Sequence, residues 1–403
     1  MPILLIAIAE WFATALWFTP NAVIGALQTS LGITPTDLGW LTGGVQLGFL
    51  LGTLTLALSG IADRVPASRL FALACLIGAG ANAALTFADS LVVATLWRVV
   101  TGCCLAGIYP IGMKLMVRWV PESTGLALSW LVGMLVLGTA MPHLLAALDW
   151  GGDYRSTLWL ASLMALVAGG VILRLGEPSA SPIAAQPASS DTSTPSERPP
   201  SRAAGFRLGG LDAFRVPAFR RAAGAYFGHM WELYTLWALL PLLLAQAMPA
   251  LGTRETALTA FALIAVGAPG CWIGGWASQH LGSQRIARIG LAGSAGCAAL
   301  FPWFAEVLAP AALVAWMALW SLLAVIDSPH FSALSARACP PPLLGSALTL
   351  QNAIGFGVSA VSLGLLVPAL PALEAQIAWL LLPGPLVGLW ALRRREADAH
   401  RSA

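Results

Sequence analysis

The sequence contains very little charge. Only 10% of its 403 residues are Asp, Glu, Lys or Arg, whereas a soluble domain carries about 25%. Lysine is almost absent, because Lys114 is the only lysine and all other basic residues are arginines. A chain with so few charged side chains cannot cover its whole surface with groups that favour water, so a soluble globular protein is excluded.

The sequence also lacks the motifs of common catalytic and cofactor sites. It contains no nucleotide-binding loop, no His-rich box, no Ser/His/Asp constellation and no quinone or haem motif. We therefore predict no catalytic residue, no metal and no cofactor. The cysteines lie in or next to apolar stretches without metal-ligand spacing, and we interpret them as small buried hydrophobic residues. They are Cys75, Cys103, Cys104, Cys271, Cys297 and Cys339.

Hydrophobic residues dominate instead. They make up 58% of the chain, and its mean hydropathy is +0.79. Apolar stretches of about 18 residues or more recur, each long enough to cross a bilayer core of about 30 Å. Because these stretches are continuous rather than alternating, they predict helices. We predict an all-α polytopic membrane protein with twelve transmembrane spans, at residues 3–27, 39–61, 69–88, 92–117, 125–147, 157–175, 222–245, 256–277, 286–304, 311–336, 344–367 and 375–392.

Arginine placement predicts how the chain is oriented. With both termini in the cytoplasm, the outer loops contain only Arg155 and Arg254, and every other arginine outside the spans lies on the inner side. This asymmetry is what the positive-inside rule requires. It predicts a multi-pass protein of a bacterial inner membrane with both termini cytoplasmic. The net charge of +3 then reflects topology, and no nucleic-acid partner is implied.

A polar segment divides the predicted spans into two sets of six. Residues 176–205 are rich in Pro, Ser, Ala and Thr, a composition that predicts a flexible cytoplasmic linker because it cannot bury enough apolar surface to fold. Arginine is mixed with Phe and Leu in residues 206–221, which favours a short amphipathic helix on the inner membrane surface. The predicted organisation is an N-terminal six-helix half (1–175), a linker (176–221), a C-terminal six-helix half (222–392) and a cytoplasmic tail (393–403).

The two halves are related by a weak parallel repeat with a spacing of about 220 residues. Two equivalent membrane halves can rock against each other around a site at their interface, which is the architecture of an alternating-access transporter. The matched positions are Trp11 and Trp231, Trp17 and Trp237, Pro20 and Pro241, Pro110 and Pro329, Arg118 and Arg337, Pro121 and Pro340, and Gly125 and Gly345.

Two short motifs carry a resemblance to a known family. Between the second and third spans, residues 59–69 read Ser-Gly-Ile-Ala-Asp-Arg-Val-Pro-Ala-Ser-Arg, in which an acidic–basic pair, Asp63 and Arg64, follows a glycine and precedes the basic Arg69. Arg98 begins an Arg-x-x-x-Gly pattern in span four. Together with twelve spans and a central linker, these residues resemble the major facilitator superfamily over essentially the whole chain. The resemblance implies secondary active transport by a monomer.

Further stretches narrow this resemblance. The run Gly-His-Met-Trp-Glu-Leu-Tyr at 228–234 and the stretch Tyr-Pro-x-x-Met-Lys at 109–114 look like the poorly characterised branch grouped with cyanate and nitrate–nitrite permeases. Span five lacks the full signature of drug antiporters, although Gly133, Gly138 and Pro142 are present. This absence disfavours multidrug export.

Ionisable residues inside the predicted spans are candidate functional groups, because each costs roughly 2.5–3.5 kcal/mol on insertion scales and usually faces a cavity or a partner. Glu10 and Glu232 fall near mid-membrane in the repeat-related spans one and seven. A buried carboxyl group can bind and release a proton, so Glu232 is a candidate proton-coupling site, with His229 three residues earlier on the same helical face. The alternative is a static hydrogen-bonded pair that holds two helices together. The ionisable residues are Glu10, Arg98, Lys114, His143, His229, Glu232, Asp327 and His330.

The other intramembrane charges allow more than one role. Arg98 could contact an anionic substrate, pair with an intramembrane acid, or satisfy backbone carbonyls in span four. Lys114 lies one turn before an arginine, so it either reaches the cytoplasmic interface or contacts the substrate. Asp327 and His330 share a helical face by their three-residue spacing, and Pro329 between them frees a carbonyl that a cation or a substrate could use.

These residues predict a proton-coupled secondary transporter of a small polar or anionic solute, with coupling through Glu232 or Asp327. The positive charges of Arg98 and Lys114 are the reason for favouring an anion. One alternative within the same fold is proton-antiport export of an amphipathic or aromatic compound, and a more remote one is a transporter-like receptor or a membrane enzyme. The expected partners are the solute, protons and membrane lipid. Further candidates for solute contact are one repeated tryptophan and four polar side chains at mid-span, which are Trp17, Tyr109, Tyr234, Gln351 and Asn352.

Overall fold

A computed structural model of the protein describes residues 2–34, 37–120, 124–148, 153–178 and 209–393, with the backbone only at 63, 124–126, 209 and 342. All regular structure within this part of the chain is helical. The first half contains α1 (Pro2–Thr14), α2 (Thr19–Ala22), α3 (Ile24–Leu31), α4 (Leu38–Ser59), α5 (Ile61–Arg64), α6 (Ala67–Ala84), α7 (Leu91–Ala106), α8 (Tyr109–Trp119), α9 (Thr124–Ala147) and α10 (Arg155–Leu175). The second half contains α11 (Gly209–Asp212), α12 (Pro217–Ala247), α13 (Thr253–Ala265), α14 (Gly267–Leu281), α15 (Ser283–Val307), α16 (Pro310–Ile326), α17 (Ser328–Ala338), α18 (Leu344–Leu373) and α19 (Pro383–Arg393).

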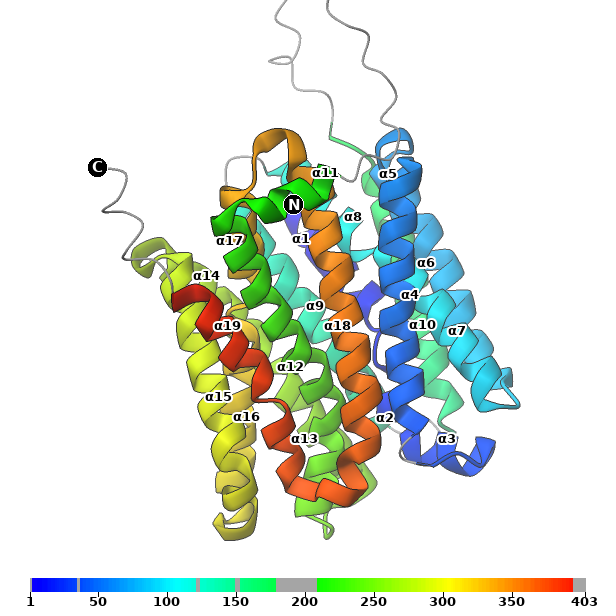
Figure 1. Ribbon diagram of the computed structural model, residues 1–403. Coiled ribbons are helices and arrows are strands. Elements are labelled where there is room, and N and C mark those ends of the chain that lie inside the picture. Colours follow the sequence, from blue (N-terminus) through cyan, green and yellow to red (C-terminus); the bar gives the residue numbers. More distant parts are fainter. Residues whose placement is uncertain (1, 35–36, 121–123, 149–152, 179–208, 394–403) are drawn as a thin grey trace, which may run out of the picture.

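The helices stand side by side as a bundle of long rods (Figure 1). Nine helical stretches among the described residues are long and apolar enough to cross a membrane, and one of these, Leu344–Arg393, contains both α18 and α19. The first predicted span corresponds to α1, α2 and α3, and the seventh to the 31-residue α12. Each of the twelve predicted ranges therefore overlaps at least one helix. The prediction of an all-α polytopic membrane protein is confirmed.

The structure describes only part of the predicted linker, and residues 179–208 and the tail from 394 lie outside the described residues. Where the composition predicts an amphipathic helix over 206–221, the described residues form the short α11 and a 3₁₀ turn (Ala213–Arg215). The long α12 already begins at Pro217, five residues before the predicted start of span seven.

Four spans that hydropathy predicts as continuous are divided between separate α-helices in the structure. The breaks separate α1 from α2, α7 from α8, α13 from α14, and α16 from α17. A proline follows each break. Proline disrupts a helix at this point because its ring lacks an N–H and clashes with the carbonyl group four residues earlier. The prolines are Pro20, Pro110, Pro269 and Pro329, and the carbonyl groups belong to Leu16, Ala106, Ala265 and Val325, each within two residues of its break.

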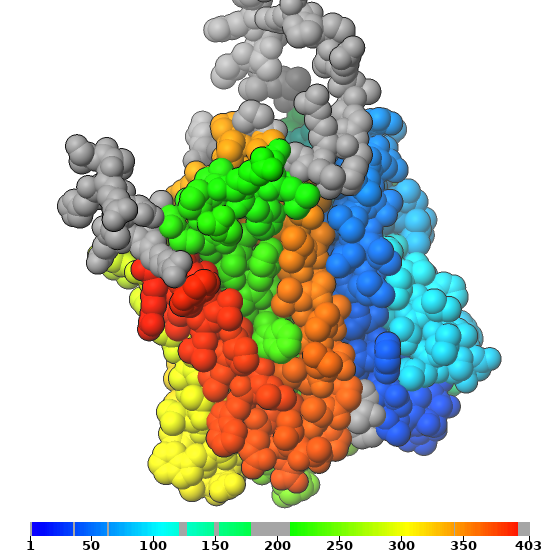
Figure 2. Space-filling view, viewed as in Figure 1, coloured from blue at the N-terminus to red at the C-terminus, as the bar shows by residue number. Residues whose placement is uncertain are grey.

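Two sets of helix contacts join the halves. α4 packs along α18, and α9 packs along α13 and α14. The blue α4 and the orange α18 lie side by side in Figure 1, and the space-filling view shows the same two helices in contact over much of their length (Figure 2). The second half is thereby fixed to the first by one pair of helices at one edge and by a three-helix contact at another.

Within the first half, α4 and α7 approach each other closely at glycine. A Cβ atom at Gly48 would lie 2.0 Å from the carbonyl oxygen of Val99, and one at Gly102 would lie 2.0 Å from the carbonyl oxygen of Val45. Small residues at such a crossing let the backbones of membrane helices touch. No larger residue fits at either position without moving a helix.

The G48A variant is expected to have a lower melting temperature, because the added methyl group meets a backbone carbonyl that cannot move alone. Overpacking of this kind costs about 1–3 kcal/mol. G80A on α6 is the matched control, since a Cβ there has nothing within 4 Å and alanine in mid-helix is favoured over glycine by roughly 0.5–1 kcal/mol. Thermal unfolding in detergent measures both, and a G48A protein that melts with the unmodified chain would contradict the packing.

The loop motif between α4 and α6 forms a tight turn and the short α5. Gly60 has a φ of +64°, a conformation that favours glycine, and it ends α4. Arg64 and Arg69 are exposed, while the side chain of Asp63 lies outside the described part of the structure.

Glu177, just after α10, ties together the ends of two other helices. Its Oε1 accepts the backbone N–H of Ser68 at 2.9 Å, and its Oε2 lies 2.8 Å from Nη1 of Arg118. Partial burial alone would raise the pKa of Glu177, but the hydrogen bonds from Ser68 and Arg118 and the charge of Arg118 outweigh it, so the pKa is lowered.

A lowered folded-state pKa means that Glu177 contributes stability above its unfolded pKa, and that this contribution is lost as the pH falls through the folded pKa. The contribution is within about 0–1 kcal/mol because both Arg118 and Glu177 are partly exposed. E177Q is therefore expected to melt slightly below the unmodified protein at about pH 7 and with it below about pH 3. Melting temperatures across this range test the claim, and a difference that does not vary with pH would refute it.

Candidate functional site at the interface of the two halves

A small cavity lies between the two halves. α8 and α9 of the first half line it together with α12, α16, α17 and α18 of the second. Its volume of about 40 Å³ leaves room for only a few water molecules. The lining residues are Tyr109, Met113, Val132, Leu135, Val136, Tyr226, Met230, Leu233, Tyr234, Trp237, Val325, Ser328, Ser332, Asn352 and Phe356.

The wall of this cavity is aromatic and uncharged. Five of its fifteen residues carry aromatic rings and none is acidic or basic. Of the polar residues predicted from the sequence, Tyr109, Tyr234 and Asn352 line the cavity, whereas Gln351 is buried on α18 without being part of the wall. The prediction missed Tyr226. The signal that could have found it is its place on α12 about two helical turns before the predicted Tyr234.

An aromatic cluster from both halves adjoins the cavity. It consists of Trp17, Phe49, Tyr234 and Phe356, and we call it the interface cluster. Trp17 stacks on Tyr234 and on Phe356 with ring centroids 5.4 and 5.8 Å apart, and the centroids of Phe49 and Phe356 are 3.9 Å apart. Aromatic pairs of this kind add about 0.5–1.5 kcal/mol beyond simple burial. Trp17, predicted as a solute contact, is fully buried and supports lining rings without being in the wall itself.

Arg98 is fully buried and binds the broken first span. Its Nη1 donates to the carbonyl oxygen of Leu16 at 3.0 Å, and its Nη2 donates to the carbonyl oxygen of Trp17. In a continuous helix the Leu16 carbonyl would accept the N–H of residue 20, but Pro20 has none. The amide oxygen of Asn82 lies 3.4 Å from Nη1 as well. The prediction placed the carbonyl groups in span four, whereas those that Arg98 contacts belong to the first span.

Glu10 and Lys114 both lie outside the cavity wall. Glu10 is fully buried, and neither of its carboxyl oxygens has a hydrogen-bond partner among the described residues. Gly112 of α8 leaves room for this carboxyl group, since a Cβ there would lie 2.4 Å from Glu10 Oε2. Lys114 donates from Nζ to the carbonyl oxygen of Ala62 in α5, so this contact is with the loop between α4 and α6.

Glu232 belongs to a hydrogen-bonded group inside the second half. Its Oε1 accepts from the hydroxyl of Ser294 on α15 and from the indole N–H of Trp320 on α16, the latter at 2.9 Å. The residue is buried, with 2% of its surface exposed. His229, predicted to act with Glu232 on one helical face, pairs with another acidic residue.

That pair joins α12 to the break between α16 and α17. His229 Nδ1 lies 2.9 Å from Asp327 Oδ1, and neither side chain is more than 2% exposed. The ring of the lining residue Tyr226 lies 6.4 Å from the His229 ring, measured between centroids. His330, predicted to share a face with Asp327, lies next to α14, where its Nε2 would be 3.4 Å from a Cβ at Gly274. The structure thus brings together His229 and Asp327 from different helices.

The sequence matches the profile of the Major Facilitator Superfamily over residues 6–363. The chain belongs to this superfamily. It is therefore a secondary transporter and a multi-pass membrane protein, from a family of transporters rather than of enzymes. A comparison with curated proteins finds no match.

R98K is expected to lower the melting temperature strongly. A lysine ammonium lacks the planar fork with which Arg98 reaches two adjacent carbonyl groups, and each buried carbonyl left unsatisfied costs about 1–3 kcal/mol. R174K is the matched control, because Arg174 is exposed at the end of α10. Thermal unfolding of the two variants in detergent measures the difference. Equal melting temperatures would show that the carbonyls of the broken span do not depend on Arg98.

Proposed function

We propose that the protein is a proton-coupled transporter that works by alternating access and carries an uncharged solute with an aromatic or amphipathic part. The composition of the cavity wall is the main support. Tyr109, Tyr234 and Trp237 supply flat apolar surface, and Ser328 and Asn352 supply hydrogen-bonding groups. A mostly apolar lining with a few polar groups suits a small solute that carries a ring. Such a solute would enter only after the halves move apart, because the cavity in this conformation has a volume of about 40 Å³.

The contacts of the basic residues favour this solute over the small anion that the sequence predicts. Arg98 donates to backbone carbonyls and Lys114 donates to the Ala62 carbonyl, and neither lines the cavity. An anion in this cavity would lose its hydration without gaining a cation. An uncharged solute would distinguish this protein from the cyanate and nitrate–nitrite permeases, whose branch its sequence resembles. A small neutral polar solute is the second candidate, favoured by the hydroxyls of Ser328 and Ser332.

The two halves meet in the way that alternating access requires. The cavity takes its wall from both halves, and the α4–α18 and α9–α13/α14 contacts lie between them. Opening to one side of the membrane needs these contacts to separate at one end only. The breaks between α7 and α8 and between α16 and α17 precede the repeat-related Pro110 and Pro329, and both offer hinge points beside the cavity.

The His229–Asp327 pair is the proposed site of proton coupling. Asp327 directly precedes the lining residue Ser328, and His229 lies beside the ring of the lining residue Tyr226. A proton taken up by Asp327 would remove the negative charge that attracts His229, and would loosen α12 from the α16–α17 break next to the cavity. Glu232 is the alternative, although its two hydrogen bonds inside the second half suit a fixed structural carboxylate.

The proposal also covers the membrane in which the protein lies, its orientation and its oligomeric state. The arginine asymmetry supports a bacterial inner membrane with both termini in the cytoplasm. Membership of the superfamily supports action as a monomer of two six-helix halves, 1–175 and 222–392, joined through the segment 176–221.

Proton movement in liposomes that contain a pH-sensitive dye tests the function. Neutral aromatic and amphipathic compounds are expected to trigger it, and small anions are not. D327N is expected to lose solute-dependent proton movement while keeping downhill solute flux, because asparagine keeps the shape of the side chain without a titratable group. E306Q is the matched control, since Glu306 is an exposed acidic residue near the end of α15.

Three outcomes would contradict parts of this proposal. Proton movement triggered by small anions alone would overturn the proposed solute. Loss of coupling in E232Q but not in D327N would transfer the coupling role to Glu232. Solute flux without any proton movement in the unmodified protein would leave a uniporter or an exchanger.

A further inference from the structure

The central cavity is lined by a hydrogen-bond donor that the protein itself does not use. Trp237 lines this cavity and is fully buried, and its indole N–H has no hydrogen-bond partner among the described residues. A buried donor without a partner is costly, because it has given up its hydrogen bond to water. At this position, the partner available to the N–H is a group that occupies the cavity.

Other tryptophans at the repeat positions do not combine these two properties. Trp231, on the same helix as Trp237, donates from its indole N–H to the carbonyl oxygen of Leu380 at 2.9 Å. Trp17, the repeat equivalent of Trp237, also has an indole N–H without a partner among the described residues, but it lies outside the cavity wall. Trp237 therefore has both an unused donor and a place in the wall.

Two tyrosines extend this pattern along the same face of α12. Tyr226 and Tyr234 line the cavity eleven and three residues before Trp237, and both are more than nine-tenths buried. No hydrogen bond joins either hydroxyl group to another described residue. The ring centroids of Tyr234 and Trp237 are 5.4 Å apart, and the rings are nearly perpendicular at 77°. These two residues place a hydroxyl group and an indole N–H in one part of the wall.

The chemistry of the wall determines what kind of group can pair with these donors. An indole N–H can only donate, and a phenol O–H can donate as well as accept. None of the fifteen lining residues is acidic, so the wall itself offers no carboxylate as an acceptor. A solute that satisfies Trp237 must therefore bring an acceptor atom of its own.

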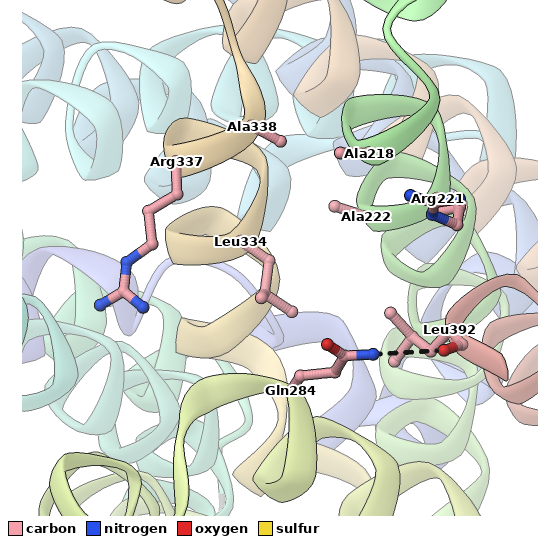
Figure 3. A pocket seen from close by; sticks show the side chains of 8 residues that line it. All are labelled: Ala218, Arg221, Ala222, Gln284, Leu334, Arg337, Ala338 and Leu392. Carbon is pink, nitrogen blue, oxygen red and sulfur yellow. Dashed lines mark hydrogen bonds between the residues drawn. The ribbon is translucent and has the colours of Figure 1, made fainter. Parts of the chain in front are cut away.

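A second, larger pocket in the other part of the second half shows a different arrangement. It lies where α12 and α15 begin and α17 and α19 end, and its volume is about 340 Å³. Figure 3 shows that the amide N–H of Gln284 is already donated to the Leu392 carbonyl, at 3.2 Å. The side chains of Arg221 and Arg337 point away from the space between α12 and α17 (Figure 3). The polar side chains of this pocket thus do not converge on a ligand.

We propose that Trp237 and Tyr234 determine specificity by donating hydrogen bonds to a carbonyl or ether oxygen attached to the ring of the solute. This inference rests on the proposed function and narrows its solute from any neutral ring compound to one with a hydrogen-bond acceptor. Phe356, also in the wall, supplies a ring on which the solute can stack. A ring without an acceptor binds less well, because it displaces water from the donors without replacing the lost hydrogen bond.

Two bicyclic compounds of similar size test this specificity. Coumarin carries a lactone carbonyl group, and naphthalene carries no acceptor. Each is titrated into the full-length protein in detergent while the melting temperature is followed, since a ligand that binds the folded state raises it. In W237F we expect the half-saturating concentration to rise about fivefold for coumarin and to change less than about twofold for naphthalene. Comparing one compound between variants cancels its partition into detergent.

Y234F removes only a hydroxyl group, is expected to weaken coumarin binding in the same selective way, and serves if W237F does not fold. W303F is the matched control, because Trp303 is exposed on α15 and does not line the cavity. Equal weakening of both compounds in W237F and Y234F, or unchanged coumarin binding in both variants, would overturn the inference. A loss in W303F as large as in W237F would do the same.

The outcomes also separate this inference from the proposed function. If neither compound stabilises the unmodified protein, the proposed class of solute is wrong and the inference falls with it. If both compounds bind and no variant distinguishes them, the donor pair alone is wrong. No proton gradient is applied in this measurement, so a failure of proton coupling would leave its result unchanged.

Discussion

A carbonyl group that a proline leaves without an N–H partner cannot find water inside a bilayer, and the first half of this protein is arranged around that constraint. Pro20 frees the Leu16 carbonyl, and Arg98 reaches from α7 to satisfy it and the next one along the chain. These bonds fix the path of the backbone between α1 and α2. They therefore also fix Trp17, whose ring stacks on Tyr234 of the other half. The stacking of Trp17 on Tyr234 across the two halves therefore depends on an arginine buried inside one of them.

The two halves share a repeat but bury different groups. The first half buries Arg98 against backbone carbonyl groups and buries the carboxyl group of Glu10 against Gly112 of α8. The second half buries His229, Glu232 and Asp327 between helices, and its long α12 remains unbroken although it contains Pro241. Under the proposed coupling through His229 and Asp327, proton exchange would take place in the second half, and the first half would supply the opposite wall of the cavity.

The membrane fold could be predicted because the hydropathy of each span identifies it as a membrane helix, without any knowledge of the helices that pack against it. The breaks were harder to predict, since Pro20 and Pro329 follow breaks while Pro142 and Pro241 lie inside unbroken helices. A proline in the sequence therefore does not by itself predict a break. Cavity residues such as Tyr109, Tyr234 and Asn352 could be found as polar side chains at mid-span. The pairing of His229 with Asp327 could not, because spacing along one helix suggests only partners three or four residues away. Which helices become neighbours is set by packing between them, as at Gly48 and Gly102.

The closed centre of the protein also makes it an electrical insulator. A cavity of about 40 Å³ with an uncharged wall cannot hold a continuous file of water across a bilayer core of about 30 Å. One elementary charge that crosses a membrane potential of 100 mV releases about 2.3 kcal/mol, so an open water path would dissipate the stored energy of the membrane as a leak current. In this conformation, the rings of the interface cluster and the helix contacts between the halves block such a water path.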